Sequence, residues 1–283
     1  MTEIPTLPPR TRGVLRRPDC EIVYEVTGSG PAIVFAHGLG GNHLSWFQQV
    51  AHFAPNWTCV TFAHRGFAPS SPIPGGPDPA DYADDLAALV AHLALSDVRI
   101  VAQSMGGWTA VEYALRRPAG LRAVVLAATT GTIDPALIRE PERSELAAWR
   151  DRVMSLMPGL APALPDHRIH IATGIRLAVE QPALHLLYQH ILDITEGVDK
   201  EALRARLGQG RVRRPEELAA AGVPVLLIAP EEDIVIPPMA ATAIAAVVPG
   251  AQAARIPLAG HSAYFERPAA FNALVEAFLT PTR

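Results

Sequence analysis

Ala102-Gln103-Ser104-Met105-Gly106-Gly107 is the stretch of sequence that decides the fold. It lies where a short apolar run, 98–102, ends and a helix-like segment, 107–116, begins. A tight turn of this kind requires small residues two positions before and two positions after its serine, and Ala102 and Gly106 meet that requirement. At the amino end of a helix, the helix dipole and the free backbone N–H groups favour developing negative charge. We interpret this serine as a candidate nucleophile, with an ordinary helix N-cap as the alternative.

Similar short apolar runs recur along the chain and predict strands that are buried on both faces, as in a parallel sheet. The runs lie at 32–36, 98–102, 123–127 and 225–229, with a half-exposed strand expected at 21–26. Helix-like segments alternate with them at 81–95, 107–116, 238–248 and 268–279. The alternation predicts an α/β fold with a mostly parallel, doubly wound sheet and right-handed crossovers. The Pro- and Arg-rich residues before Glu21 are expected to form a mobile lead-in.

One long stretch interrupts this alternation. From about Ile133 to about Leu218 the sequence is charged, amphipathic and helix-prone, with no strand candidate. We interpret 133–218 as a helical cap inserted into a core made of 1–132 and 219–283. Its aromatic and Met side chains are expected to form the roof of a largely apolar pocket over the nucleophile.

A serine nucleophile requires a base, and the base requires a carboxylate to orient it. His261 lies in a glycine-flanked loop before the final helix, a natural place for an exposed imidazole. Three acids follow the strand at 225–229, and functional groups gather at the carboxyl ends of parallel strands. Of these we choose Asp233, because Glu231 and Glu232 lie nearer the strand and are expected to cap the turn or face solvent. The chain order Ser104, Asp233, His261 is the one expected of an α/β-sheet hydrolase.

The glycine-rich segment His37-Gly38-Leu39-Gly40-Gly41 follows the strand at 32–36. Chemistry at a carbonyl needs two backbone N–H donors for the oxyanion, and we assign these to Met105 and Leu39. His37, Gly38 and Gln103 are expected to contact the substrate. Dinucleotide binding is disfavoured, because the G-x-G-x-x-G spacing is absent and no acidic ribose partner is evident.

The composition of the chain excludes several classes of protein and of binding site. The chain is 49% hydrophobic and 18% charged, which excludes intrinsic disorder as its main state. Twenty-four Lys and Arg against 28 Asp and Glu give a formal charge of -4, and no basic block occurs. The sequence therefore shows no positively charged surface that would bind nucleic acid or an anionic membrane. Lys200 is the only lysine, which excludes a G-x-x-x-x-G-K phosphate loop. The expected partner is a small molecule, with no cofactor.

Cysteine usage and hydropathy indicate where the chain acts. Cys20 and Cys59 have neither metal-ligand spacing nor the density of a disulfide scaffold, so we expect a reduced, cytoplasmic protein with no metal site. No apolar run reaches the ~18 residues of a membrane span, and the start of the chain lacks the apolar run of a signal peptide. We expect a monomer or homodimer without membrane contact.

With these elements in one order, nearly the whole chain resembles the α/β-hydrolase superfamily, in the branch of esterases, lactonases and carbon-carbon hydrolases with a helical cap. The resemblance assigns Ser104 as nucleophile, Asp233 as acid, His261 as base, and Leu39 and Met105 as oxyanion donors. Departures from the family pattern occur at Ala102, at Pro230 and in the segment Ala63-His64-Arg65-Gly66-Phe67-Ala68-Pro69-Ser70, which lacks an acid and a glycine.

The expected reaction is hydrolysis of a small or medium, largely apolar ester, lactone or thioester through an acyl-enzyme. Three alternatives stay open, because one fold hosts many reactions. A carbon-carbon hydrolase would want a cap arginine for a substrate carboxylate, and the candidates are Arg150, Arg152, Arg168 and Arg176. A cofactor-free oxygenase would use the His261 and Asp233 pair as a base, and a ligand receptor would retain a slow triad.

Overall fold

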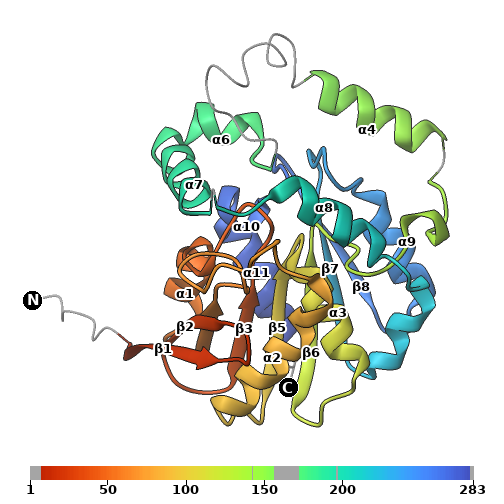
Figure 1. Cartoon of the computed structure of the whole chain (residues 1–283). Helices are drawn as coiled ribbons and strands as arrows, with labels where there is room; N and C mark the ends of the chain where they lie inside the picture. The colour runs from red at the N-terminus through yellow and green to blue at the C-terminus, as the bar shows by residue number, and fades with distance from the viewer. Residues whose placement is uncertain (1–7, 142, 156–171, 196, 281–283) are drawn as a thin grey trace, which may run out of the picture.

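A single eight-stranded sheet runs through the computed structural model of the protein, which describes residues 8–141, 143–155, 172–195 and 197–280. The strand order is β1-β2-β4-β3-β5-β6-β7-β8 (Figure 1). The strands are β1 (Arg10–Arg16), β2 (Glu21–Thr27), β3 (Ala32–Ala36), β4 (Thr58–Phe62), β5 (Val98–Gln103), β6 (Leu121–Ala127), β7 (Val225–Pro230) and β8 (Gln252–Ile256). Only β1 with β2 and β2 with β4 pair antiparallel. The predicted fold class is confirmed.

Helices cover both faces of the sheet. Those of the core are α1 (Phe47–Phe53), α2 (Tyr82–His92), α3 (Gly106–Leu115), α9 (Met239–Val247), α10 (Ala263–Glu266) and α11 (Pro268–Leu279). Strand β3 shows how alternation divides the core: Val34 packs with residues of α2, α3 and α9, whereas Ile33 and Phe35 pack with residues of α1 and α11. Both faces of β3 are thus buried, which explains its continuous apolar sequence.

Three strands were missing from the sequence prediction. β1 pairs along its whole length with β2, so the expectation of a mobile lead-in is wrong for residues 10–16. Its alternating arginines face solvent at the sheet edge. β8 is also an edge strand with mostly exposed side chains, and β4 mixes Thr and Cys with apolar residues. None of the three carries the apolar run that marks a strand buried on both faces.

A helical insertion separates β6 from β7. It contains α4 (Arg143–Ser155), α6 (Ile175–Glu180), α7 (Pro182–Ile194) and α8 (Lys200–Gln209), which Figure 1 shows at one end of the sheet. Among the described residues between these two strands, the strand-like pairing is an isolated bridge from Ile133 to Arg213. We call these four helices the cap. No helix in the described part of the chain is long and apolar enough to span a membrane.

Candidate active site

Ser104 lies in a strained turn between β5 and α3. Its φ is +50°, a left-handed conformation that is uncommon for a residue with a side chain. Gly106 follows in the first turn of α3, and a Cβ on it would lie 2.2 Å from the carbonyl oxygen of Ala36. Only glycine therefore allows α3 to start this close to β3. The structure thus contains the tight strand-to-helix turn at Ser104 that a nucleophile elbow requires.

Ser104, His261 and Asp233 come together from three separate loops. The Oγ of Ser104 lies 2.9 Å from Nε2 of His261, and Nδ1 of His261 lies 2.9 Å from Oδ2 of Asp233. Because the carboxylate can only accept, Nδ1 carries the proton, and Nε2 is left to accept from the serine hydroxyl. The structure thus brings together the three residues chosen from the sequence, in the arrangement of a nucleophile, its base and an orienting acid.

The loop after β7 fixes the Asp233 carboxylate. Its Oδ1 accepts hydrogen bonds from the backbone N–H groups of Val235 (2.7 Å) and Ile236 (3.0 Å), and the side chain is fully buried. These bonds fix the carboxylate so that its second oxygen, Oδ2, faces the histidine.

The two neighbouring acids hold the cap. Glu231 accepts from Arg152 of α4 at 2.8 Å, and Glu232 accepts from Nε of Arg176 of α6 at 2.8 Å. The expectation that both would cap the turn or face solvent is wrong for Glu232, which is buried, whereas Glu231 stays partly exposed at its pair with Arg152. A buried carboxylate needs a charged partner, and a cap arginine supplies it.

Another buried carboxylate, that of Glu266, holds the loop of His261. Glu266 accepts hydrogen bonds from the N–H groups of Gly260 (2.8 Å) and Ser262 (3.2 Å), on either side of His261. The carbonyl of His261 accepts from Nε2 of Gln103 at 3.1 Å. Burial raises the pKa of Glu266, and the backbone N–H groups that it accepts from oppose that shift. Sequence reasoning missed Glu266, which reads there as an ordinary acid in a helix.

The glycine-rich loop after β3 lies against the elbow. A Cβ on Gly38 would lie 2.1 Å from Oε1 of Gln103 and 3.1 Å from Cβ of Ser104, so the loop backbone passes directly beside the serine. In the described part of the chain, neither the Leu39 nor the Met105 amide donates a hydrogen bond to a protein acceptor. Both amides are therefore available to a ligand oxygen.

The side chain of His37 supports this loop through hydrogen bonds. Its Nδ1 donates to the carbonyl of Gly38 (2.8 Å) and its Nε2 accepts from the N–H of His64 (3.0 Å). The ring is completely buried, and burial lowers the pKa of His37 to about 3. His37 and Gly38 lie outside the lining of the cavity above Ser104, whereas Gln103 is part of it. The expectation of substrate contact is therefore not met for His37, because its ring lies behind the loop.

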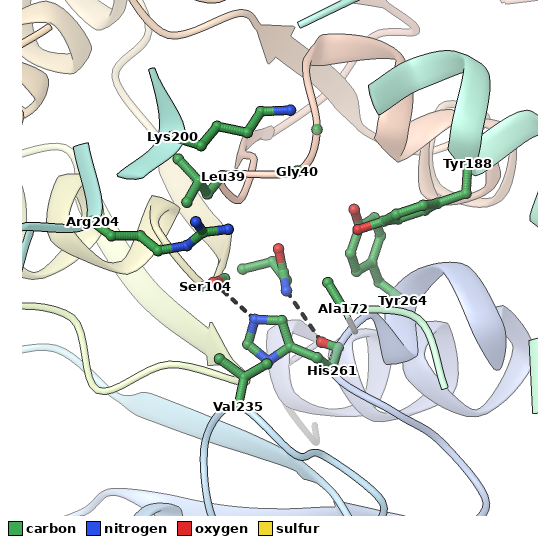
Figure 2. A pocket seen from close by; sticks show the side chains of 12 residues that line it. Leu39, Gly40, Ser104, Ala172, Tyr188, Lys200, Arg204, Val235, His261 and Tyr264 are labelled. Atoms are coloured by element: carbon green, nitrogen blue, oxygen red, sulfur yellow. Dashed lines mark hydrogen bonds between the residues drawn. The ribbon is translucent and has the colours of Figure 1, made fainter. Parts of the chain in front are cut away.

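A cavity opens above Ser104 between the core and the cap (Figure 2). It holds about 520 Å³ of empty space, including the part that is open to solvent. Its lining residues are Leu39, Gly40, Gly41, Gln103, Ser104, Ala172, Tyr188, Lys200, Arg204, Val235, His261 and Tyr264. The sequence predicted a largely apolar pocket, but two cations of α8 line it. The signal that was missed is the single lysine of the chain, followed four residues later by an arginine.

Metal-binding groups are not a feature of this site. The described residues contain no cluster of three or more His, Cys, Asp or Glu side chains that could hold a metal ion. Cys20 and Cys59 are both buried, and neither forms a disulfide.

Comparisons with known proteins agree with this fold. Residues 31–268 match the family model described as alpha/beta hydrolase fold. A Mycobacterium tuberculosis relative named "Putative non-heme bromoperoxidase BpoC" is 28% identical over 269 residues, covering 93% of this chain and 98% of the relative.

Solved structures show the same architecture. Est816, described as an N-acyl homoserine lactone degrading enzyme, has a TM-score of 0.74 at 23% identity, covering 94% of this chain and 100% of Est816. The enol-lactonase from Burkholderia xenovorans LB400 also has a TM-score of 0.74, at 24% identity, covering 95% of this chain and 100% of the lactonase. At these identities the likeness establishes the fold.

Proposed function

The chain belongs to the α/β-hydrolase fold family, and from that membership we propose that it is a serine hydrolase that cleaves carboxylic esters, lactones or thioesters through an acyl-enzyme on Ser104. One observation carries the proposal: an unbroken chain of hydrogen bonds from Asp233 through His261 to Ser104, ending in an open cavity. A helix N-cap, the alternative role for this serine, does not call for a histidine at its hydroxyl.

In the first half of the reaction, Nε2 of His261 takes the proton of the Ser104 hydroxyl while Oγ attacks the substrate carbonyl. The oxyanion is stabilised by the N–H groups of Leu39 and Met105. The tetrahedral intermediate collapses, the bond to the alcohol breaks, and His261 gives its proton to the leaving oxygen. Asp233 stabilises the imidazolium in between.

In the second half, a water molecule attacks the acyl carbonyl and His261 takes the proton of that water. The second tetrahedral intermediate releases the carboxylic acid as the bond to Oγ breaks. His261 then returns its proton to the serine hydroxyl. The cycle consumes one water and needs no other co-reactant.

The four arginines named for a carbon-carbon hydrolase do not supply its carboxylate site, although another cap arginine, Arg204, does line the cavity. Two of its four candidate arginines, Arg152 and Arg176, are paired with Glu231 and Glu232, and Arg168 lies outside the described residues. None of the four lines the cavity above Ser104 in the described part of the chain.

The test is hydrolysis of a series of p-nitrophenyl esters from short to long acyl chains, with and without oxygen. We expect Ser104→Ala to lose about 10³-fold or more in turnover regardless of oxygen. Ser96→Ala is the control, because Ser96 is exposed at the opposite end of β5. Full activity in Ser104→Ala, or a need for oxygen, would reject the acyl-enzyme and favour base chemistry by His261.

A further inference from the structure

Two cations reach the cavity from one helix. Lys200 and Arg204 lie one turn apart on α8, and both line the cavity above Ser104. Figure 2 shows the guanidinium of Arg204 extending from the cap toward Ser104, with the Lys200 side chain above Leu39 at the edge of the same cavity. None of the described residues that line this cavity is an Asp or a Glu. The charged side chains in the described lining are therefore both cations, although the chain as a whole is acidic.

Helix α8 is fixed firmly to the core. Nε1 of Trp108 donates to the carbonyl of Leu207 at 3.0 Å, and Leu203 and Leu207 are buried against the same tryptophan. The guanidinium of Arg206 donates to the carbonyls of Gly75, Gly76 and Pro77 at 2.7 to 2.9 Å. Because these contacts fix the register of α8, they also fix where Lys200 and Arg204 enter the cavity, although Arg204 keeps an exposed side chain.

Arg204 differs from the other arginines of the cap that contact the core. Arg152 and Arg176 each pair with an acid of the loop after β7, and Arg206 is bonded to carbonyls. In the described part of the chain no carboxylate lies within salt-bridge distance of Arg204. Lys200 donates from Nζ to Oγ1 of Thr195 at 3.0 Å, which holds the ammonium group near the top of the cavity.

We propose that Arg204, with Lys200 beside it, binds a carboxylate carried by the substrate, so that the preferred substrates are anionic esters or lactones. A guanidinium presents a planar fork that matches a carboxylate, and it keeps its charge at every physiological pH. The inference rests on the proposed hydrolase function and names the substrate class for it. It replaces the largely apolar substrate expected from the sequence.

The experiment compares monomethyl adipate with methyl hexanoate, two esters that share their acyl chain length and differ in a terminal carboxylate. The quantity measured is the ratio of kcat/KM for the anionic ester to that for the neutral ester. We expect wild type to favour the anionic ester and Arg204→Gln to lower the ratio about tenfold or more through KM, with Arg204→Lys between them. Arg122→Gln removes the same charge from the exposed start of β6 and is expected to leave the ratio unchanged.

Binding separates failure of this inference from failure of the proposed function. Adipate is titrated calorimetrically into wild type, Arg204→Gln and Arg122→Gln, with inorganic phosphate as a second probe. If neither ester is hydrolysed but adipate binds and Arg204→Gln weakens it about tenfold, the hydrolase proposal fails and the carboxylate site stands. An unchanged selectivity ratio in Arg204→Gln, or phosphate binding without adipate binding, would overturn the carboxylate site.

Discussion

Nε1 of Trp149, on cap helix α4, donates a hydrogen bond to the main-chain carbonyl of Asp233 at 3.0 Å. The same loop meets the cap again through Glu231 with Arg152 and Glu232 with Arg176. Three consecutive residues of the acid loop are thus bound to cap helices. The position of the cap and the position of the acid that orients His261 are therefore physically linked.

Removing the Trp149 bond tests this link. We expect Trp149→Phe to lower kcat/KM for a preferred ester about fivefold, because one hydrogen bond that positions the Asp233 backbone is lost while the aromatic ring is kept. The control is Trp57→Phe, before β4, where Arg99 lies 5.2 Å from the ring centroid. An equal loss of activity in both variants would mean that the Asp233 backbone does not depend on the cap.

We expect loss of the Asp233 carboxylate to reduce activity far more than loss of the Trp149 hydrogen bond. In Asp233→Asn one oxygen can still accept from Val235 and Ile236, but the amide N–H₂ group then faces Nδ1 of His261. The imidazole is forced toward the wrong tautomer, and we expect kcat to fall by up to about 10⁴. Glu231→Gln, in the same loop but paired with Arg152, should keep most of the activity. Steady-state kinetics on both purified variants decide the point.

The sequence predicted the centre of the molecule well because the centre obeys strong local rules. The elbow needs small residues around Ser104, and buried parallel strands need continuous apolar runs. The three residues of the hydrogen-bonded chain could be chosen because each lies in a turn or loop marked by the end of a strand or by a glycine. Edge strands such as β1 were not predicted, because the side chains of an exposed edge strand show little hydrophobic pattern.

The contacts that depend on distant parts of the chain could not be predicted. Glu266 supports the His261 loop and Arg204 enters the cavity only because the folded chain brings them there. From the sequence, Glu232 is interpreted as a solvated acid. In the structure it pairs with Arg176 of α6. Such pairings are set by tertiary packing and have no signal in local composition.

The buried side chains of His37 and His64 should make the free energy of unfolding depend on pH. Burial lowers the pKa of His37 to about 3 and that of His64 well below its usual value. Between pH 7 and 5.5 the unfolded chain takes up protons at these rings and the folded chain does not, so stability falls as pH falls. We expect each ring to contribute a loss of about 1 kcal/mol in unfolding free energy over that window.

Urea unfolding of wild type and His37→Gln at both pH values measures this contribution. The substitution is expected to reduce the loss by about 1 kcal/mol. His190→Gln, at an exposed position of α7, serves as the control and is expected to keep the wild-type pH dependence. An identical pH dependence in wild type and His37→Gln would show that His37 takes up its proton in the folded state.

Arg65, in the turn where the sequence departs from the family pattern, is expected to stabilise the fold. Its guanidinium bonds Asp85 through Nε at 2.6 Å and a terminal nitrogen at 2.7 Å, and also meets Asp19 and Asp81. The side chains of Arg65 and Asp85 are only 5% and 2% exposed. Removing one partner from a buried pair leaves an uncompensated charge, which is strongly destabilising.

We expect Arg65→Met to lower the unfolding free energy by about 3 kcal/mol, softened because Arg17 still reaches Asp85 at 2.9 Å. The matched control is Arg10→Met, which breaks an ion pair with Glu25 in which Arg10 is 63% exposed and should cost less than about 1 kcal/mol. Denaturant unfolding of both variants gives the two values directly. Equal losses would mean that Arg65 stabilises the fold no more than a surface ion pair does, and that the buried network does not hold this turn to Asp19 and α2.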